Sequence, residues 1–332
     1  MNPEPLVVRQ LRETRERLLL QEASQMQDMA RRWLQVEDAL EAQFSAISQQ
    51  MAALKADGRE LTQAQLFRQE RYRSLLVQAR REIDGYVTWA DDLITQRQGH
   101  LAMVGLDEAA LAIDNSYTVQ MVGNFTRLPV SAVENMIGLA GNGSPLRSLL
   151  IQASPDAINA ITKTLITNTA LGKNPRETAR QMAKSSEIGL QRSLVIARTE
   201  QLRVFREASR QQYIASGVVR GYRRMAAHNG RTCAACLALD GQFYPLDTPL
   251  ADHPSGRCCL VPAVKGVSGP QWQSGEDWLR DQPEAIQRET LGAGHYDLWK
   301  AGMPLEDMVH VSYDPVWGES VGVKPLKALA DA

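Results

Sequence analysis

The sequence lacks several features that define common protein classes. Its 332 residues hold 37 Lys and Arg against 38 Asp and Glu, so the formal net charge is −1. A charge this close to zero argues against a general nucleic-acid coat or a polybasic membrane binder. Hydrophobic residues at 44% and charged residues at 23% exclude a wholly disordered chain. Aromatic residues at 6% suit a helix-rich core better than an all-β one.

Long apolar runs are also missing. No window approaches the roughly 18 consecutive apolar residues that a membrane-spanning helix needs. The first five residues, Met-Asn-Pro-Glu-Pro, offer neither the basic nor the apolar segment of a secretory signal. We therefore expect a protein that folds in a cytoplasm and has no membrane partner.

Apolar spacing predicts two long helices in the first hundred residues. In the first, intervals of four and three residues alternate, with one polar break at Glu37. Asp57-Gly58 would end it, and the capping box in residues 62–65 would begin a second helix, patterned over residues 72–93. The short link predicts an antiparallel, coiled-coil hairpin that either packs into a bundle or docks on a partner. The first pattern comprises Leu19, Ala23, Met26, Ala30, Trp33, Glu37, Leu40, Phe44, Ile47, Met51 and Leu54.

The rest of the chain divides into three further segments. Residues 101–190 carry helical patterns with Gly, Pro and Asn between them. Residues 191–265 combine a helix ending near Gly217 with strand-like stretches of β-branched and aromatic residues. Residues 266–332 hold four of the six tryptophans, which predicts an ordered extension. With residues 1–100 as a helical arm, the fold class is α+β: a long helical hairpin and a helical middle, then a small mixed α/β domain.

Asp240-Gly241 is the clearest turn signal in that domain. Glycine tolerates the positive φ of a tight turn, and the pair lies between Leu237-Ala238-Leu239 and Gln242-Phe243-Tyr244. These two stretches therefore predict the arms of a zinc-knuckle-like β-hairpin.

All four cysteines lie between Cys233 and Cys259. A disulfide framework would spread them along the chain, whereas Cys-x2-Cys is a spacing that grips one metal ion. The full pattern is Cys-x2-Cys-x16-His-x4-Cys. It predicts a closed structural Zn²⁺ site that stabilises a hairpin with little core of its own. The predicted ligands are Cys233, Cys236, His253 and Cys258.

Alternatives to this site remain open. In one alternative, the four cysteines are unrelated buried or surface thiols that bind no metal. In another, the Cys-x-x-Cys pair is a redox motif, although such motifs open a helix after a strand and a hairpin is expected here. Either Cys258 or its neighbour Cys259 would ligate, and His228 and Asp252 are outside candidates.

An arginine-rich segment precedes the cluster. Residues 192–231 contain nine arginines and two acids, Glu200 and Glu207, which gives a net charge of +7. One interpretation is a solvated face with internal ion pairs, and the other is a surface facing DNA or an acidic protein. The candidates for that surface are Arg203, Arg206, Arg210, Arg220, Arg223 and Arg224.

Common catalytic motifs are missing. The chain has no Gly-rich phosphate loop, no Gly-x-Ser-x-Gly and no His-Glu-x-x-His. His228-Asn229 beside the Cys-x-x-Cys is only partly similar to an HNH-type nuclease, which usually adds a second Cys-x-x-Cys and a catalytic His. We therefore expect no enzyme.

Several motifs in a fixed order resemble the phage Mu protein F-like minor head protein family. The resemblance spans roughly residues 160–265, and the ordered combination is more specific than any one piece. One departure is Gly256, at a position where the family often has cysteine. The motifs are Ile196-Ala-Arg-Thr-Glu200, Tyr213–Val218, Arg231-Thr-Cys-Ala-Ala-Cys-Leu-Ala-Leu-Asp-Gly241, His253–Cys258 and Leu260-Val-Pro262.

The resemblance implies a structural minor head protein of a tailed phage or prophage. Such a protein would act with the portal protein in head morphogenesis or in DNA packaging and delivery. Other capsid or scaffolding proteins and packaged double-stranded DNA are further expected partners, and no small-molecule substrate is expected. The expected location is the head interior near the portal vertex, after assembly in the bacterial cytoplasm.

The motif residues would then have structural roles. Arg198 and Glu200, with Thr199 between them, are expected to pair and to fix their helix against the zinc hairpin, and Asp240 and Gly241 to form its turn. Two other functions remain open: a metal-dependent nuclease or toxin-like effector, for which a chain of this length leaves no added domain, and a DNA-binding zinc module.

Overall fold

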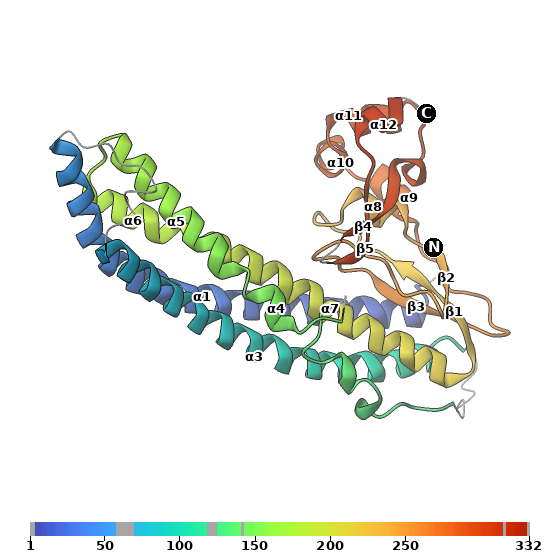
Figure 1. The fold of residues 1–332 in the computed structure, drawn as a ribbon. Coiled ribbons are helices and arrows are strands. Elements are labelled where there is room, and N and C mark those ends of the chain that lie inside the picture. Colours follow the sequence, from blue (N-terminus) through green and yellow to red (C-terminus); the bar gives the residue numbers. More distant parts are fainter. Residues whose placement is uncertain (1–3, 58–69, 118–124, 141–142, 315–316, 331–332) are drawn as a thin grey trace. The chain divides into compact units, whose positions relative to one another are not determined.

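A computed structural model of the chain describes residues 4–57, 70–117, 125–140, 143–314 and 317–330 (Figure 1). The predicted stop at Gly58 and the capping box in residues 62–65 lie outside the described residues. The chain forms two compact units. Unit 1 draws on residues 1–20, 97–143 and 198–332, and unit 2 on residues 21–96 and 144–197.

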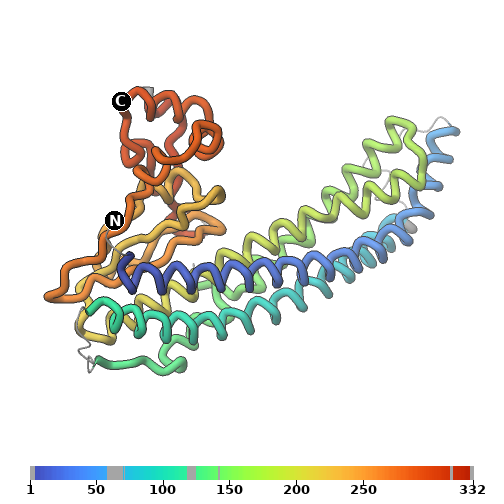
Figure 2. Tube along the Cα trace, turned by 180° about the vertical axis from the view of Figure 1, so that it is seen from behind, coloured from blue at the N-terminus to red at the C-terminus, as the bar shows by residue number. Residues whose placement is uncertain are grey.

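The units do not follow the order of the chain, because three long helices contribute to both. These helices are α1 (Leu6–Ala56), α3 (Glu70–Asp114) and α7 (Glu187–Ser216), and both long N-terminal helices were predicted. Figure 2 follows them along the chain trace. The four sequential segments expected from the sequence, residues 1–100, 101–190, 191–265 and 266–332, do not coincide with these two units, and that division stays a prediction. None of the helices in the described ranges is long and apolar enough to cross a membrane.

Unit 2 is built of helices. Besides its parts of the three long helices, it contains α4 (Leu146–Leu150), α5 (Ala153–Ala170) and α6 (Pro175–Ser185). Trp33 meets Tyr86 edge-to-face with ring centroids 4.7 Å apart, which joins α1 to α3. The buried Tyr72 hydroxyl donates to Thr162 Oγ1 at 2.8 Å, which joins α3 to α5.

The predicted apolar seam of α1 is correct in its second half and displaced in its first. From Trp33 to Met51 the predicted positions are buried, except that Val36 is buried in place of Glu37, and Leu54 is half-buried. In the first half of the pattern the buried residues are Leu18, Gln25 and Met29, each one position before a predicted one. A helix turns every 3.6 residues, so a strict alternation of four and three drifts by about 20° per heptad.

Glu37 lies beside this seam and is the source of a pH effect in unit 2. Burial and the nearby Glu187 and Asp38 carboxylates raise its pKa from 4.5 to about 7, against a hydrogen bond from Trp33 and the charge of Lys184. A raised carboxyl pKa favours the folded state at low pH, and this contribution disappears as pH rises from about 4.5 through 7.

Glu37→Gln should therefore increase stability at pH 8 and change it little at pH 5. Urea unfolding at both pH values measures the effect, with Glu82→Gln on the exposed face of α3 as the control. An equal effect of Glu37→Gln at the two pH values would contradict the prediction.

Unit 1 contains a three-stranded antiparallel sheet of order β2-β1-β3. Its strands are β1 (Val219–Met225), β2 (Phe243–Pro245) and β3 (Cys259–Val264). One part of the core joins Tyr222 and Leu260 to Tyr213 of α7 and Ile113 of α3. Another packs Met225 of β1 and the β3 residues Cys259 and Val261 against the first turns of α1, at Val7, Val8 and Leu11. The first turns of α1 therefore belong to the core around the sheet.

The expected hairpin across Asp240-Gly241 is wrong in its first arm. Residues 237–238 end a short helix, α8 (Ala234–Ala238), and the second arm, β2, pairs with β1 instead. Alanine and leucine favour a helix, and the Cys233 sulfur caps it by accepting from Cys236 N at 3.4 Å. Gly241 still supplies the expected positive φ, at 80°.

The C-terminal part of unit 1 is ordered, as the tryptophans predicted. Leu237 of α8, Leu279, Trp299 and Met308 share one buried cluster. The elements are α9 (Gly275–Arg280), α10 (Glu284–Leu291), α11 (Ala293–Lys300), β4 (Val309–Asp314), β5 (Gly318–Val323) and α12 (Leu326–Ala330), with 3₁₀ turns at Val130–Ala132, Glu134–Met136 and Leu305–Met308.

Candidate metal centre

Three of the four predicted ligands meet at the start of α8. His253 Nε2 lies 3.1 Å from Cys233 Sγ and 3.3 Å from Cys236 Sγ. The ligand atoms of these three residues all lie within 4.8 Å of one another. Cys233 is the N-cap of α8 and Cys236 lies in its first turn, so the helix fixes the spacing of the two sulfurs.

The fourth predicted ligand, Cys258, lies on the other side of Cys236. Its sulfur forms a second group of atoms within 4.8 Å with Cys236 and the carboxylate of Asp252. Cys236 therefore belongs to both groups. Cys259, the other candidate, is buried among Val7, Val8 and Leu11 of α1, because successive residues of β3 point to opposite faces.

A cavity of about 30 Å³ separates the four predicted ligands. Cys233, Cys236, His253 and Cys258 all line it, and Asp252 does not. The cavity is large enough for a water-sized sphere, so it has room for a single ion. Together with the sulfur and nitrogen donors that zinc and related metals prefer, the cavity makes the residues fit a bound metal.

The orientation of His253 also suits a metal ligand. Its Nδ1 lies 2.9 Å from the carbonyl oxygen of Pro254, which can only accept a hydrogen bond. Nδ1 therefore carries a proton, and Nε2 is the ring atom that faces the two sulfurs. A hydrogen bond of this kind on the outer nitrogen is typical of metal-binding histidines.

The pKa values record the close approach of these groups. A hydrogen bond with Cys236 raises the pKa of His253 to about 9 against the effect of burial. A hydrogen bond with Cys236 also lowers the pKa of Cys233. For Cys258, a hydrogen bond with Cys236 and complete burial raise the pKa. These contacts thus favour the charged forms of His253 and Cys233 and the neutral form of Cys258.

A buried ion-pair network lies directly behind the cluster. Arg224 Nη2 contacts Asp252 Oδ1 at 2.8 Å, and Arg206 Nη1 contacts Asp252 Oδ2 at 3.1 Å. The side chains of Arg224, Asp252 and Arg206 are 0%, 4% and 8% exposed. The expectation that Arg206 and Arg224 face DNA or a partner is therefore wrong, because Asp252 draws both guanidinium groups into the interior.

The other predicted surface arginines have partners within unit 1. Arg203 pairs with Glu200 at 2.7 Å, and Arg210 pairs with Glu207 at 2.6 Å. Arg220 lies over the ring of Phe243 at 5.2 Å from its centroid. In addition, Arg223 donates to the Gly241 carbonyl at 3.3 Å. Most of these arginines thus have partners within the fold, which agrees with the interpretation of internal ion pairs.

Residues of the Ala-Arg-Thr-Glu motif and the next turn of α7 hold the loop that carries His253. Thr199 Oγ1 accepts a hydrogen bond from Ser255 N at 2.9 Å. Arg206 Nη1 donates to the Gly256 carbonyl at 3.0 Å. Glu200 is buried and pairs with Arg203 one turn further along α7, while Arg198 is half-buried.

Asp240 has a larger role than the turn predicted for it. Its fully buried carboxylate accepts from Ala226 N at 2.7 Å, contacts His228 Nε2 at 2.8 Å and accepts from Trp272 Nε1 at 3.1 Å. His228 is thus engaged with Asp240 and is not among the grouped ligands. Sequence reasoning missed this network, because Ala226, His228 and Trp272 lie 12 to 32 residues away from Asp240 in the chain.

Gly256 has a steric reason to be glycine. A Cβ at this position would lie 2.0 Å from Asp252 Oδ2. Two buried arginines pin that carboxylate, so it cannot move away. The carboxylate thus fills the space beside the position where the family often has cysteine.

Gly256→Ala should therefore destabilise unit 1 by about 1–3 kcal/mol, as overpacking does. Denaturant unfolding checks this against Gly230→Ala, where a Cβ would meet nothing within 4 Å. Equal stability of the two variants would contradict the steric explanation.

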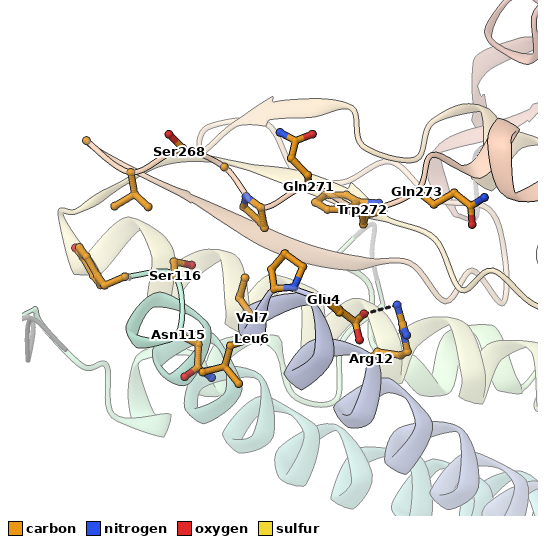
Figure 3. Close-up of a pocket in the computed structure, with 16 residues that line it drawn as sticks. Glu4, Leu6, Val7, Arg12, Asn115, Ser116, Ser268, Gln271, Trp272 and Gln273 are labelled. Atoms are coloured by element: carbon orange, nitrogen blue, oxygen red, sulfur yellow. Dashed lines mark ion pairs between the residues drawn. The ribbon is translucent and has the colours of Figure 1, made fainter. Parts of the chain in front are cut away.

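A separate cavity of about 1050 Å³ lies at the N-terminal end of α1. Val7, Asn115, Gln271 and Trp272 line it, and the ion pair between Arg12 and Glu4 stands at its edge (Figure 3). Its apolar and amide-rich lining differs from the sulfur and nitrogen donors of the cluster. We therefore place the candidate metal centre at the Cys/His cluster and not in this cavity.

The site defines the class of the domain: a small α+β unit with Cys and His side chains placed to hold a metal ion. The family model described as "Phage Mu protein F like protein" matches residues 159–261. This confirms the resemblance inferred from the motifs for residues 159–261, which are similar to a family of phage head proteins. No curated protein and no solved structure matches the chain.

Proposed function

We propose that the protein is a minor head protein of a tailed phage or prophage that acts in head morphogenesis. The observation that carries the proposal is the family match over residues 159–261, which contain the whole Cys/His cluster. A structural role agrees with this cluster, since its donors surround one small cavity and leave no substrate-sized space between them. The protein belongs in the virion, in the head interior near the portal.

The metal is Zn²⁺, held by Cys233, Cys236, His253 and Cys258. When bound, the ion supplies a rigid link between α8, the loop of residues 252–257 and the start of β3. The chain's own residues orient this link: Cys233 caps α8, and Pro254 fixes the ring of His253. The sheet β2-β1-β3 then keeps its shape in an assembly.

The partner is the portal protein, and the long helices of unit 2 bind it. Exposed apolar side chains support this proposal: Leu34 of α1 is 54% exposed, Val77 of α3 is 60% and Leu171 after α5 is 69%. Packaged DNA and other capsid or scaffolding proteins are further partners, and Arg220, exposed on β1, is the arginine best placed for DNA.

The test is co-sedimentation of the full chain with rings of the portal protein from the same phage or prophage. Deleting the helical arm is unsuitable, because Val7, Val8 and Leu11 of α1 belong to the core of unit 1. Leu34→Glu with Val77→Glu should instead abolish co-sedimentation, whereas Val311→Glu, at an equally exposed site on β4, should not. Unchanged binding by the first variant would exclude this surface, and metal-dependent cleavage of supercoiled DNA would overturn the structural assignment.

A further inference from the structure

Arg224 is the residue of unit 1 whose position the proposed function does not explain. It lies in the middle strand of the sheet, and its side chain is completely buried. A buried guanidinium requires compensating acceptors, because the loss of hydration is large. The acceptors around it identify its role.

These acceptors are the residues of the metal centre and its neighbours. Arg224 Nη2 donates to Cys236 Sγ at 3.4 Å and to Asp252 Oδ1 at 2.8 Å. Nη1 donates to the Ala251 carbonyl at 2.9 Å, and Cys258 is also within hydrogen-bonding reach. One guanidinium therefore contacts two predicted ligands and the chain just before a third, His253.

We propose that Arg224 is a positioning residue of the metal centre: it holds the Cys236 and Cys258 sulfurs toward the ion and keeps the Asp252 carboxylate away from it. This inference rests on the proposed metal site. Asp252 Oδ1 accepts from Arg224 Nη2 at 2.8 Å, and Oδ2 forms an ion pair with Arg206 Nη1 at 3.1 Å, so both oxygens face guanidinium groups. The group formed by Cys236, Asp252 and Cys258 then holds a guanidinium and not a second metal ion.

The charges agree with this arrangement. A divalent ion with three thiolates and a neutral imidazole carries a net charge of −1. Arg224 and Arg206 contribute two positive charges and Asp252 one negative charge, so the buried assembly is neutral when the ion is bound. Neutrality matters here because uncompensated charge is strongly unfavourable in the interior.

The test is titration of the purified protein with Co²⁺, monitored by the thiolate-to-cobalt absorption band and by competition with a chelator. Arg224→Lys and Arg224→Met should bind Co²⁺ about 10- to 100-fold more weakly than the wild type, as other outer-sphere substitutions do. Arg224→Met leaves the Arg206–Asp252 pair balanced, so the variant should fold. Arg210→Met is the matched control, since Arg210 is also largely buried and paired but does not touch the cluster.

The absorption band separates positioning from a general effect on stability. In Arg224→Met, Asp252 Oδ1 loses its guanidinium partner while Oδ2 stays beside Arg206, and Oδ1 should then replace a thiolate, which lowers the band intensity per bound Co²⁺. Adding Asp252→Asn should restore the intensity. Wild-type protein that binds no Co²⁺ would overturn the metal centre itself, whereas Arg224 variants with wild-type affinity and spectrum would overturn only the role of Arg224.

Discussion

Cys236→Ser is expected to abolish metal binding and to unfold the region around the sheet β2-β1-β3. Cys236 is the member that both ligand groups share, so its loss leaves neither group complete. A structural zinc ion contributes on the order of 10 kcal/mol of apparent binding free energy, which is comparable to the whole stability of a domain. Metal analysis and circular dichroism of the variant measure the two effects.

The matched control is Cys259→Ala. Cys259 has the same chemistry and a similar position, but its side chain packs on the first turns of α1 and takes no part in the ligand groups. It should keep the wild-type metal content and lose only the stability that comes from packing. A Cys236→Ser protein that retains metal and a folded sheet would exclude the predicted ligand set.

Asp252→Ala should destabilise unit 1 by about 3–5 kcal/mol, the range seen when one partner of a buried ion pair is removed. The carboxylate is the shared partner of Arg206 and Arg224, and both guanidinium groups would remain buried without it. The same carboxylate accepts from His253 N at 3.0 Å, so the metal-binding loop would also loosen. The free energy of unfolding in urea gives the measurement.

Asp156→Ala is the control for this change. Asp156 pairs with Arg192 at 3.5 Å, but the two side chains are 42% and 34% exposed, respectively. Such a pair contributes roughly 0–1 kcal/mol. If Asp252→Ala were as mild as Asp156→Ala, the arginines would not depend on Asp252 for their burial.

The parts of the fold that follow from local patterns could be predicted. The long helices follow from apolar periodicity, and β1 follows from its β-branched and aromatic residues. The ligand pattern was recognisable because the chemistry of the residues and their spacing carry it, even though the hairpin drawn between its halves was wrong. Asp240-Gly241 forms its turn as expected. Such a turn can connect a helix to a strand as well as two strands, so it did not show that α8 precedes β2.

The features that depend on contacts between distant segments could not be predicted. Arg206, Arg224 and Asp252 lie on α7, on β1 and in the loop before β3, and nothing near any of them in the sequence indicates that they meet. The arginine-rich segment therefore suggested a surface that binds DNA or a partner, whereas two of its members, Arg206 and Arg224, are buried. The steric constraint at Gly256 is hidden for the same reason, because the atom that would collide with it belongs to the pinned carboxylate.

The metal content of the purified full-length protein tests the central claim most directly. The account predicts about one zinc ion per chain, and predicts that removing it with a chelator exposes Cys233, Cys236 and Cys258 to a thiol reagent while the sheet loses structure. Protein that contains no transition metal, binds none when zinc is supplied and keeps the sheet folded would contradict it.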